Sequence, residues 1–505
     1  MKELLKKMDK PVFMTAFLVC GLLVLSFFIA PVQMGQISEK IFNFLMQNFK
    51  WCFVLAADII IVFCLFIAFS KYGRIRLGKD TDRPEFSNLS WFAMMFSAGM
   101  GVGLIFFGVT EPMSHFMDPL TAQAWTGAAA TESMHITFFH WGIHPWAIYT
   151  SVALPFAYFH YRKKTSPLVS SCIAPLFPGK KHRLLNISLD ALTIIITLLG
   201  ISISFGMGAL QISSGLNIVF GIPNTLLTTI CVIIAGTVAF TLSSMLGIEK
   251  GMKRISDFNM QLAVAFIIFV FIFGPTIYCV NTLIEGIGGY LSHFISLSFF
   301  TDAQQTIETA KGYNWMSNWT IFYWAMWILW SPFVGIFIAK ISKGRTIREF
   351  VTVVLLIPTL FSCIWFSVIG GSALKMSQDG NGLIAEAVLK DSTGGIFALL
   401  QNLPVPLISC VLIMISLAIF FITSADASTQ VLVTMSCKGE EIRSHFFRVL
   451  WSILIGALAC MLIFSGGINA MQQVSVFFTL PYIIVILLLL LSLFLSLKRE
   501  YKIKN

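Results

Sequence analysis

The sequence has few charged residues. Aspartate, glutamate, lysine and arginine make up 11% of its 505 residues, whereas a soluble domain carries about 25%. It also has no long polar stretch that could fold as a separate soluble domain. Because 57% of the chain is hydrophobic, we expect an all-α polytopic membrane protein that sits in a lipid bilayer. The net charge of +10 does not indicate a nucleic-acid partner, because the basic residues lie in short segments between apolar runs.

Other absences exclude further classes of protein. The ten cysteines include no Cys-x-x-Cys pair, so no disulfide framework is expected. The first apolar run is not followed by a small-residue cleavage pattern, which predicts a retained helix rather than a signal peptide. His140 and His144 have the i, i+4 spacing of metal ligands, but the other histidines form no second such pair. We therefore expect neither a metal enzyme nor a cofactor.

Twelve apolar runs are long enough to cross about 30 Å of hydrocarbon. They begin near Pro11, Trp51, Ser90, Met134, Leu189, Asn224, Phe258, Trp319, Glu349, Pro404, Phe446 and Val474. If these runs cross alternately, every lysine and arginine falls on one side except Lys40, Lys50, Lys311, Lys375 and Lys390. Since basic residues mark the cytoplasmic side, the sequence predicts twelve spans with both termini in the cytoplasm.

The predicted eighth span is rich in tryptophan. At about 100° per residue, Trp324, Trp327 and Trp330 lie within about 120° of the helix circumference. Tryptophan commonly anchors helices at the membrane–water boundary, and indoles also pack well. A face of indoles inside the bilayer also suits a quaternary ammonium group, which is attracted to ring faces by cation–π interaction. The spacing leaves both interpretations open.

The predicted fourth span contains the segment HWGIHPWAIY, from His140 to Tyr149. Its Pro145 cannot donate a backbone hydrogen bond one turn back, so a kink is expected. Trp141, Trp146 and Tyr149 can line one wall of a cavity, and with Trp327 they could surround a trimethylammonium group. Packing or interfacial aromatics are again the alternative.

Two further stretches carry groups suited to polar ligands. Gly99, Gly101 and Gly103 alternate in the third span, which favours a helix that is interrupted within the membrane and turns backbone amides toward a carboxylate or ion. Glycines also serve close helix packing. The tenth span is expected to end in Ala418–Gln430, whose hydroxyl groups suit a sodium-type hard cation, unless they only bond their own backbone one turn back.

Four acidic residues lie in or near the predicted spans, namely Asp58, Glu111, Asp190 and Asp426. Ionisable residues within a membrane are functional candidates. Glu111 and Asp190 lie near predicted span ends, so helix capping is the alternative interpretation for these two.

With these segments placed, the chain resembles the betaine/carnitine/choline transporter family. The matching segments are GMGVGLIFFGVTEP, HWGIHPWAIY, WTIFYWAMWILWSPFVGIFIAKISKGRTIREF and FITSADAS, which occur in family order over nearly all twelve spans. The resemblance implies a LeuT-like architecture of two inverted five-helix repeats, at 90–280 and 318–498, after two accessory helices in 1–89. It also implies an external connection with an amphipathic helix at 281–317, a short cytoplasmic tail at 499–505, a location in the bacterial inner membrane and, as is common in the family, a homotrimer.

The resemblance also implies the residues of the site. The substrate-binding residues would be Trp141, Trp146, Tyr149, Trp327, Trp330, Phe333, Met100, Gly101, Gly103, Trp324, Met326 and Ser204. The main sodium site would use the carbonyls of Ser97, Met100 and Phe420 and the hydroxyls of Thr423 and Ser424.

Three positions depart from the family pattern. Met326 replaces a tryptophan, which keeps apolar bulk but loses the ring quadrupole. Ile201 stands where a second sodium site would have a hydroxyl one turn from Thr197, so a two-sodium stoichiometry is not supported. Gly103 stands where choline carriers tend to have aspartate. Because a net cation in a low-dielectric pocket needs a counter-charge, we expect a zwitterion such as glycine betaine rather than choline.

These observations predict a sodium-coupled secondary active importer that works by alternating access. The alternatives within the family are a sodium-independent exchanger of betaines or carnitine and a choline transporter. From a different class, the alternative is a receptor or channel for a quaternary amine.

Overall fold

The computed structural model describes residues 7–99, 101–179, 182–246, 249–380, 382–440, 442 and 444–504, without the side chains of residues 96–99, 246, 249–253 and 503–504. Helices account for nearly all of this part of the chain, and no strand occurs in it, which confirms the predicted all-α class. The longer helices are α2 (Lys10–Ile29), α3 (Pro31–Phe69), α4 (Asn88–Gly99), α5 (Val102–Met117), α6 (Gly127–Trp141), α7 (Ile143–Ala157), α9 (Arg183–Phe220), α10 (Leu226–Leu246), α11 (Glu249–Phe273), α12 (Thr276–Ser298), α14 (Phe322–Ile341), α15 (Ile347–Asp379), α18 (Pro406–Ser436), α19 (His445–Phe464) and α20 (Ile468–Lys504). The shorter segments are η1 (Lys71–Arg74), η2 (Tyr158–Arg162), α8 (Val169–Ile173), η3 (Ala174–Leu176), α13 (Thr306–Lys311), η4 (Ser317–Ile321), α16 (Leu383–Lys390), η5 (Ser392–Gly394) and α17 (Gly395–Gln401).

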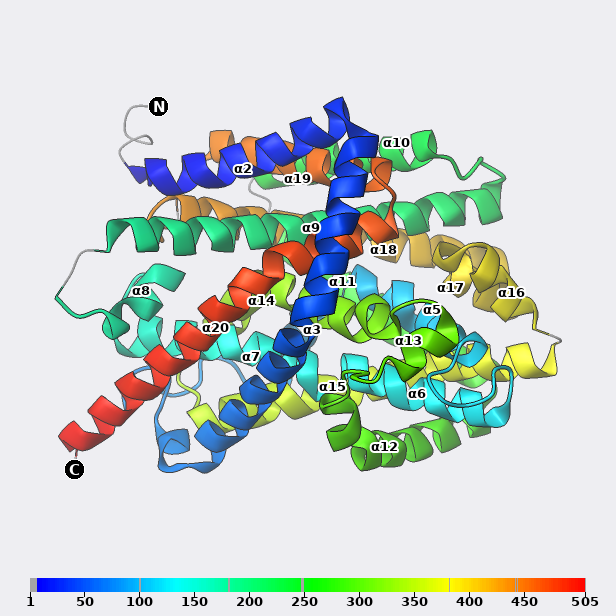
Figure 1. The fold of residues 1–505 in the computed structure, drawn as a ribbon, viewed down its shortest axis with the longest axis horizontal. Helices are drawn as coiled ribbons and strands as arrows, with labels where there is room; N and C mark the ends of the chain where they lie inside the picture. Colours follow the sequence, from blue (N-terminus) through cyan, green and yellow to red (C-terminus); the bar gives the residue numbers. More distant parts are fainter. Residues whose placement is uncertain are drawn as a thin grey trace.

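Ten helices of the described chain are long and apolar enough to cross a membrane, namely α2, α3, α9, α10, α11, α14, α15, α18, α19 and α20. The two other predicted spans, from near Ser90 and Met134, are each occupied by a pair of shorter helices, α4 with α5 and α6 with α7. The second predicted span, from near Trp51, lies within α3, a longer helix that already begins at Pro31. Polar residues interrupt the apolar pattern before Trp51, but no proline does. In Figure 1, α2 begins and α20 ends at the same end of the molecule.

The first helix pair is interrupted where the alternating glycines predict it. α4 ends at Gly99 and α5 begins at Val102. Between them Gly101 has φ −131° and ψ −146°, which lies far from helical values. The Leu104 amide donates to the Gly101 carbonyl at 3.1 Å, whereas the amides of Val102 and Gly103 lie at the start of a helix, where a regular partner one turn back is missing and a ligand can bind.

The second pair is interrupted at Gly142, where φ is −89° and ψ is −131°. The expected kink thus lies three residues before Pro145, because the proline ring excludes the carbonyl one turn earlier, that of Trp141. The amide of Ile143 donates instead to the hydroxyl of Tyr290 on α12, at 3.0 Å. A methyl group at position 142 would lie 2.5 Å from both the Tyr290 hydroxyl and the Phe138 carbonyl, so only glycine fits this junction.

α14 lies in the interior and packs closely against helices on two sides. A methyl group at Gly200 of α9 would lie 2.9 Å from the Leu329 carbonyl, and one at Gly335 of α14 would lie 3.1 Å from the Ala153 nitrogen of α7. Small residues at helix crossings permit this close approach. α14 is therefore held between α7 and α9, with its tryptophans in the protein interior.

Candidate functional site

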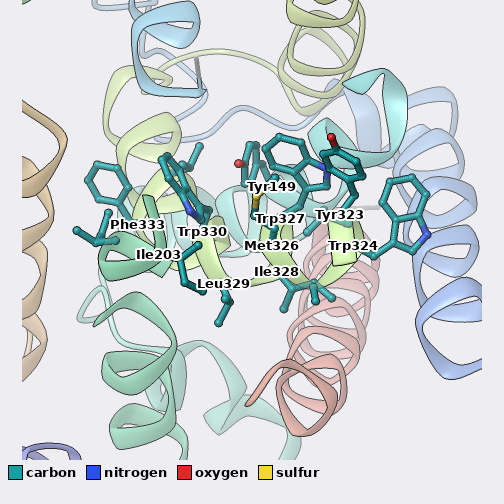
Figure 2. Packing of buried hydrophobic residues seen from close by; sticks show 14 of the residues in the cluster. Tyr149, Ile203, Tyr323, Trp324, Met326, Trp327, Ile328, Leu329, Trp330 and Phe333 are labelled. Atoms are coloured by element: carbon teal, nitrogen blue, oxygen red, sulfur yellow. The ribbon is translucent and has the colours of Figure 1, made fainter. Parts of the chain in front are cut away.

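Aromatic rings from α6, α7 and α14 meet in the interior. The indoles of Trp141 and Trp327 lie edge to face with ring centroids 4.9 Å apart, and Tyr149 lies edge to face with Trp327 at 6.0 Å. Trp146 contacts Tyr149 in the same way at 5.5 Å. All four side chains are buried. The rings that were predicted to surround a ligand thus converge within the protein, and Figure 2 shows Tyr149 beside Trp327.

A small cavity lies among these rings and the break in the third span. It is lined by Gly101, Gly103, Leu104, Trp141, Ser204, Met207, Met326, Trp327 and Trp330. All of these except Leu104 and Met207 belong to the predicted substrate site. The cavity volume is ≈ 20 Å³, which is room for about one water molecule. Binding of a larger molecule therefore requires the surrounding helices to move apart.

The other predicted substrate residues occupy different surroundings. Tyr149 packs against Trp327 of the cavity wall, and Trp146 packs against Tyr149, but neither of them lines the cavity. Trp324 faces away from the cavity, since its ring is stacked on His144 with centroids 4.7 Å apart, and Figure 2 shows it far from Trp330 on α14. Phe333 lies one turn beyond Trp330. Met100 lies outside the described residues.

Two hydrogen-bond donors of this site have no partner in the described part of the protein. The Tyr149 hydroxyl and the Trp330 indole nitrogen are both buried and unpaired. Buried polar groups are normally hydrogen-bonded, and Trp330 also lines the cavity. The site therefore presents aromatic surface together with an unused donor.

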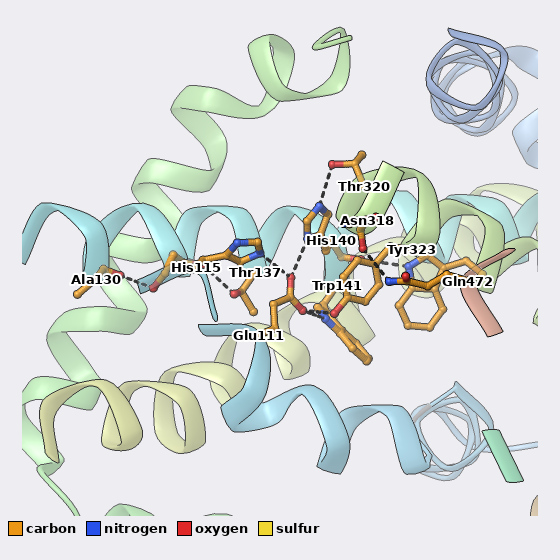
Figure 3. A network of polar contacts seen from close by, with 12 residues as sticks. Glu111, His115, Ala130, Thr137, His140, Trp141, Asn318, Thr320, Tyr323 and Gln472 are labelled. Carbon is orange, nitrogen blue, oxygen red and sulfur yellow. Dashed lines mark hydrogen bonds and ion pairs between the residues drawn. The ribbon is translucent and has the colours of Figure 1, made fainter. Parts of the chain in front are cut away.

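Glu111 forms the main polar cluster next to these rings (Figure 3). Trp141 Nε1 donates to Glu111 Oε2 at 2.6 Å, and the Tyr323 hydroxyl donates to the same oxygen. His140 Nδ1 lies 2.7 Å from Glu111 Oε1. The carboxyl group is fully buried within α5, so the capping interpretation is wrong for Glu111. The helix continues through Pro112 to Met117, although the sequence indicated an end there.

The remaining acids and histidines have separate partners. Asp190 accepts hydrogen bonds from the amide of Ser170 at 3.0 Å and from its hydroxyl at 2.5 Å, which is a capping role at the start of α8. His144 Nε2 lies 3.1 Å from the Ser298 hydroxyl and 3.8 Å from Asp58. His140 and His144 thus bind different groups and do not share a metal position. A different set of residues has the spacing of metal ligands, since one atom each of Glu111, His115 and His140 lie within 4.8 Å of one another.

Of the predicted sodium site, the structure fully describes only the part that lies on α18 (Pro406–Ser436). α18 contains the whole of Ala418–Gln430 and continues to Ser436. The Thr423 hydroxyl donates to the carbonyls of Ile419 at 2.9 Å and Phe420 at 3.1 Å, as the backbone-bonding alternative requires. This bonding also places the Phe420 and Thr423 oxygens next to each other. Met100 lies outside the described residues, as does the side chain of Ser97.

α18 and the break in the third span approach the same point on α9. A methyl group at Gly208 would lie 3.3 Å from Val102, the first residue of α5, and 3.6 Å from Phe421. The oxygens of Phe420 and Thr423 are therefore on a helix that reaches the interrupted segment.

A larger cavity of ≈ 460 Å³ lies among Phe156 of α7, Ile336 of α14 and Val431 of α18, with Lys340 and Lys343 at its border. Along α14, Trp330 borders the small cavity and Ile336 borders the large one. Phe333 lies between these two residues in the helix. Lys340 and Lys343 at its border belong to the basic residues that the sequence predicts to be on the cytoplasmic side.

Known proteins match the chain over nearly its whole length. The family model described as "BCCT, betaine/carnitine/choline family transporter" matches residues 11–502. The chain is 41% identical to a glycine betaine transporter of Bacillus subtilis, over 94% of this chain and 91% of the relative. It is 39% identical to a probable glycine betaine transporter of Desulfitobacterium hafniense, over 93% and 94%. It is 36% identical to an osmo-dependent choline transporter of Acinetobacter baylyi, over 96% and 71%.

Proposed function

The chain belongs to the betaine/carnitine/choline transporter family, and we propose that it imports glycine betaine or a similar zwitterion by secondary active transport. Members of this family are transporters and not enzymes, in agreement with the expectation from the sequence. The observation that carries the proposal is the cavity that Trp141, Trp327 and Trp330 enclose beside the break at Gly101.

The chemistry of this cavity favours a molecule that carries both a positive and a negative charge. The indole faces attract a methylated ammonium group, which cannot donate hydrogen bonds. The unpaired Trp330 N–H and the N-terminal amides of α5 favour a carboxylate. None of the described residues that line the cavity is charged, so a net cation would have no side-chain counter-charge there. A zwitterion carries its own counter-charge, which is why we favour glycine betaine over choline.

The two cavities support transport by alternating access. We propose that the helix pairs α4–α5 and α6–α7 are the third and fourth of twelve spans, arranged as LeuT-like inverted repeats in the bacterial inner membrane with both termini cytoplasmic. The large cavity would then be the cytoplasmic vestibule, and Phe333 would separate it from the substrate. A homotrimer remains an expectation from the family.

Sodium is the proposed coupling ion. Carbonyl and hydroxyl oxygens are ligands that hard cations prefer, and the Phe420 and Thr423 oxygens fit this requirement. An ion held between α18 and the interrupted third span would favour the conformation in which the substrate site is also formed, so the two ligands would bind cooperatively.

Uptake into proteoliposomes tests the proposal. We expect radiolabelled glycine betaine to accumulate against its gradient when sodium is higher outside than inside, and choline, carnitine and ectoine to be taken up less well. Better uptake of choline would contradict the substrate assignment. Uptake that is unchanged when potassium replaces sodium would favour the sodium-independent exchanger instead.

A further inference from the structure

We propose that Glu111 of α5 is a positioning residue for the substrate site, which fixes the Trp141 indole through hydrogen bonds and not through its charge. This inference rests on the proposed function, because it assigns Trp141 to the substrate.

The carboxyl group joins three helices at one buried point (Figure 3). Its Oε2 atom accepts the Trp141 Nε1–H of α6 at 2.6 Å and the Tyr323 hydroxyl of α14. The side chains of Glu111 and His140 are completely buried, so water cannot replace a lost partner. The position of the Trp141 ring relative to α14 is therefore set by an oxygen on α5.

The same cluster also reaches the second tryptophan of the cavity. His140 Nδ1 lies 2.7 Å from Glu111 Oε1, and its Nε2 lies 3.0 Å from the Thr320 hydroxyl. The backbone carbonyl of His140 accepts the Trp327 Nε1–H at 3.2 Å. Glu111 thus holds Trp141 directly. Through its contact with His140 it also supports Trp327.

Among the described residues, the alternative acceptor beside the Trp141 N–H is the Tyr323 hydroxyl, which itself depends on Glu111 for its own partner. The ring is packed against Phe107 and Phe366, with centroids 5.9 Å and 5.1 Å away, and these side chains offer no hydrogen-bond acceptor. Cation–π attraction depends on the ring face that the cation meets. An indole that turned to find another acceptor would present a different face to the cavity.

A role of Glu111 through its charge and a role through its hydrogen-bond geometry predict opposite effects for two conservative substitutions. Glutamine keeps the length of the side chain: its oxygen can accept from Trp141 and Tyr323, while its NH₂ group donates to His140 in the other neutral tautomer. Aspartate keeps the charge but is one carbon–carbon bond shorter, about 1.5 Å, and cannot reach Trp141 at the same distance. Positioning therefore requires Glu111→Gln to be tolerated and Glu111→Asp to be harmful.

The experiment measures KM and the maximal rate of glycine betaine uptake in proteoliposomes, normalised to the amount of folded protein. We expect Glu111→Gln to stay within about twofold of the wild-type KM. We expect Glu111→Asp to raise KM about tenfold while the maximal rate changes less, since leaving the buried Trp141 N–H without its acceptor is worth about that factor. Glu111→Met, which has similar length and no acceptor oxygen, should behave like Glu111→Asp and replaces it if that variant does not fold. Asp190→Asn removes a buried carboxylate outside the site and serves as the matched control, with an unchanged KM.

Each remaining result contradicts the inference. If Glu111→Gln raises KM and Glu111→Asp does not, Glu111 acts through its charge. If Asp190→Asn raises KM as much as Glu111→Asp does, the effect is general loss of packing. If the wild type transports while no Glu111 variant changes KM, only this inference is wrong, whereas a wild type that transports no quaternary ammonium compound overturns the proposed function as well.

Discussion

The indole of Trp141 stands edge-on to the indole of Trp327, with ring centroids 4.9 Å apart and ring planes inclined by 80°. The two residues come from different helices, α6 and α14, so their contact depends on how these helices pack. In the described state little space is left between the rings and Gly101. A substrate therefore has to separate surfaces that now touch each other, and this requirement links binding to helix movement.

Removing an indole from the cavity should weaken substrate binding. Trp327→Leu keeps an apolar side chain but loses the ring face, so we expect KM for glycine betaine to rise about 2- to 30-fold, which corresponds to the 0.5–2 kcal/mol of a cation–π contact. Trp324→Leu is the matched control on the same helix, because Trp324 is stacked on His144 outside the cavity. A similar increase in KM for both variants would show that packing of α14, and not the ring face, is responsible.

A carboxylate at position 103 should change the substrate preference. A methyl group at Gly103 would lie 3.4 Å from the Trp141 ring, so Gly103→Asp places a negative charge beside the cavity without severe overlap. We expect the ratio of choline uptake to glycine betaine uptake to rise at least about tenfold, or 1.4 kcal/mol of relative stabilisation. Gly103→Asn is the uncharged control, and an equal shift in that variant would contradict the electrostatic reason.

Loss of a hydroxyl from α18 should weaken sodium dependence. Thr423→Ala removes an oxygen next to the Phe420 carbonyl, and we expect the sodium concentration for half-maximal uptake to rise about tenfold. Thr429→Ala is the control, since the Thr429 hydroxyl is buried and bonds only the Ala425 carbonyl among the described partners, at 2.7 Å. An unchanged sodium requirement in Thr423→Ala would remove this residue from the proposed ion site.

The junction at Gly142 should not tolerate a larger residue. Gly142→Ala introduces a methyl group 2.5 Å from the Tyr290 hydroxyl and the Phe138 carbonyl, and overpacking of this kind costs about 1–3 kcal/mol. We expect a lower midpoint of thermal unfolding in detergent. Gly288→Ala on α12 adds a methyl group into open space and should leave the midpoint unchanged or raise it. Equal midpoints for the two variants would mean that the junction can relax.

The sequence could predict those features that depend on residues close together in the chain, such as helices and helix breaks. Apolar runs identified the helices that now form ten candidate spans, and the alternating glycines indicated the interruption at Gly101. The convergence of Trp141 and Trp327 came from family resemblance combined with helical spacing. Spacing around a helix gives an angle and not a neighbour, which is why Trp324 was grouped with Trp327 although its ring contacts His144.

The Glu111 cluster was beyond such reasoning. Its partners lie 29, 30 and 212 residues away in the sequence, and no periodicity connects three helices. One signal was present, because a glutamate at the end of an apolar run is costly in a membrane. Glu111 also lies near a predicted span end, and the capping interpretation that this position favoured hid the buried carboxyl group. Tyr290 was missed for the same reason, since nothing local to α12 indicates an unpaired amide at Ile143.

The hydroxyl of Tyr290 gives α12 a role that a simple connecting helix would not have. α12 supplies the acceptor for the first amide of α7, so α7 cannot shift along its axis unless α12 shifts with it or the bond is lost. A nanobody that clamps α12 would therefore restrain the transport cycle as a non-competitive inhibitor, without occupying the space that the substrate enters.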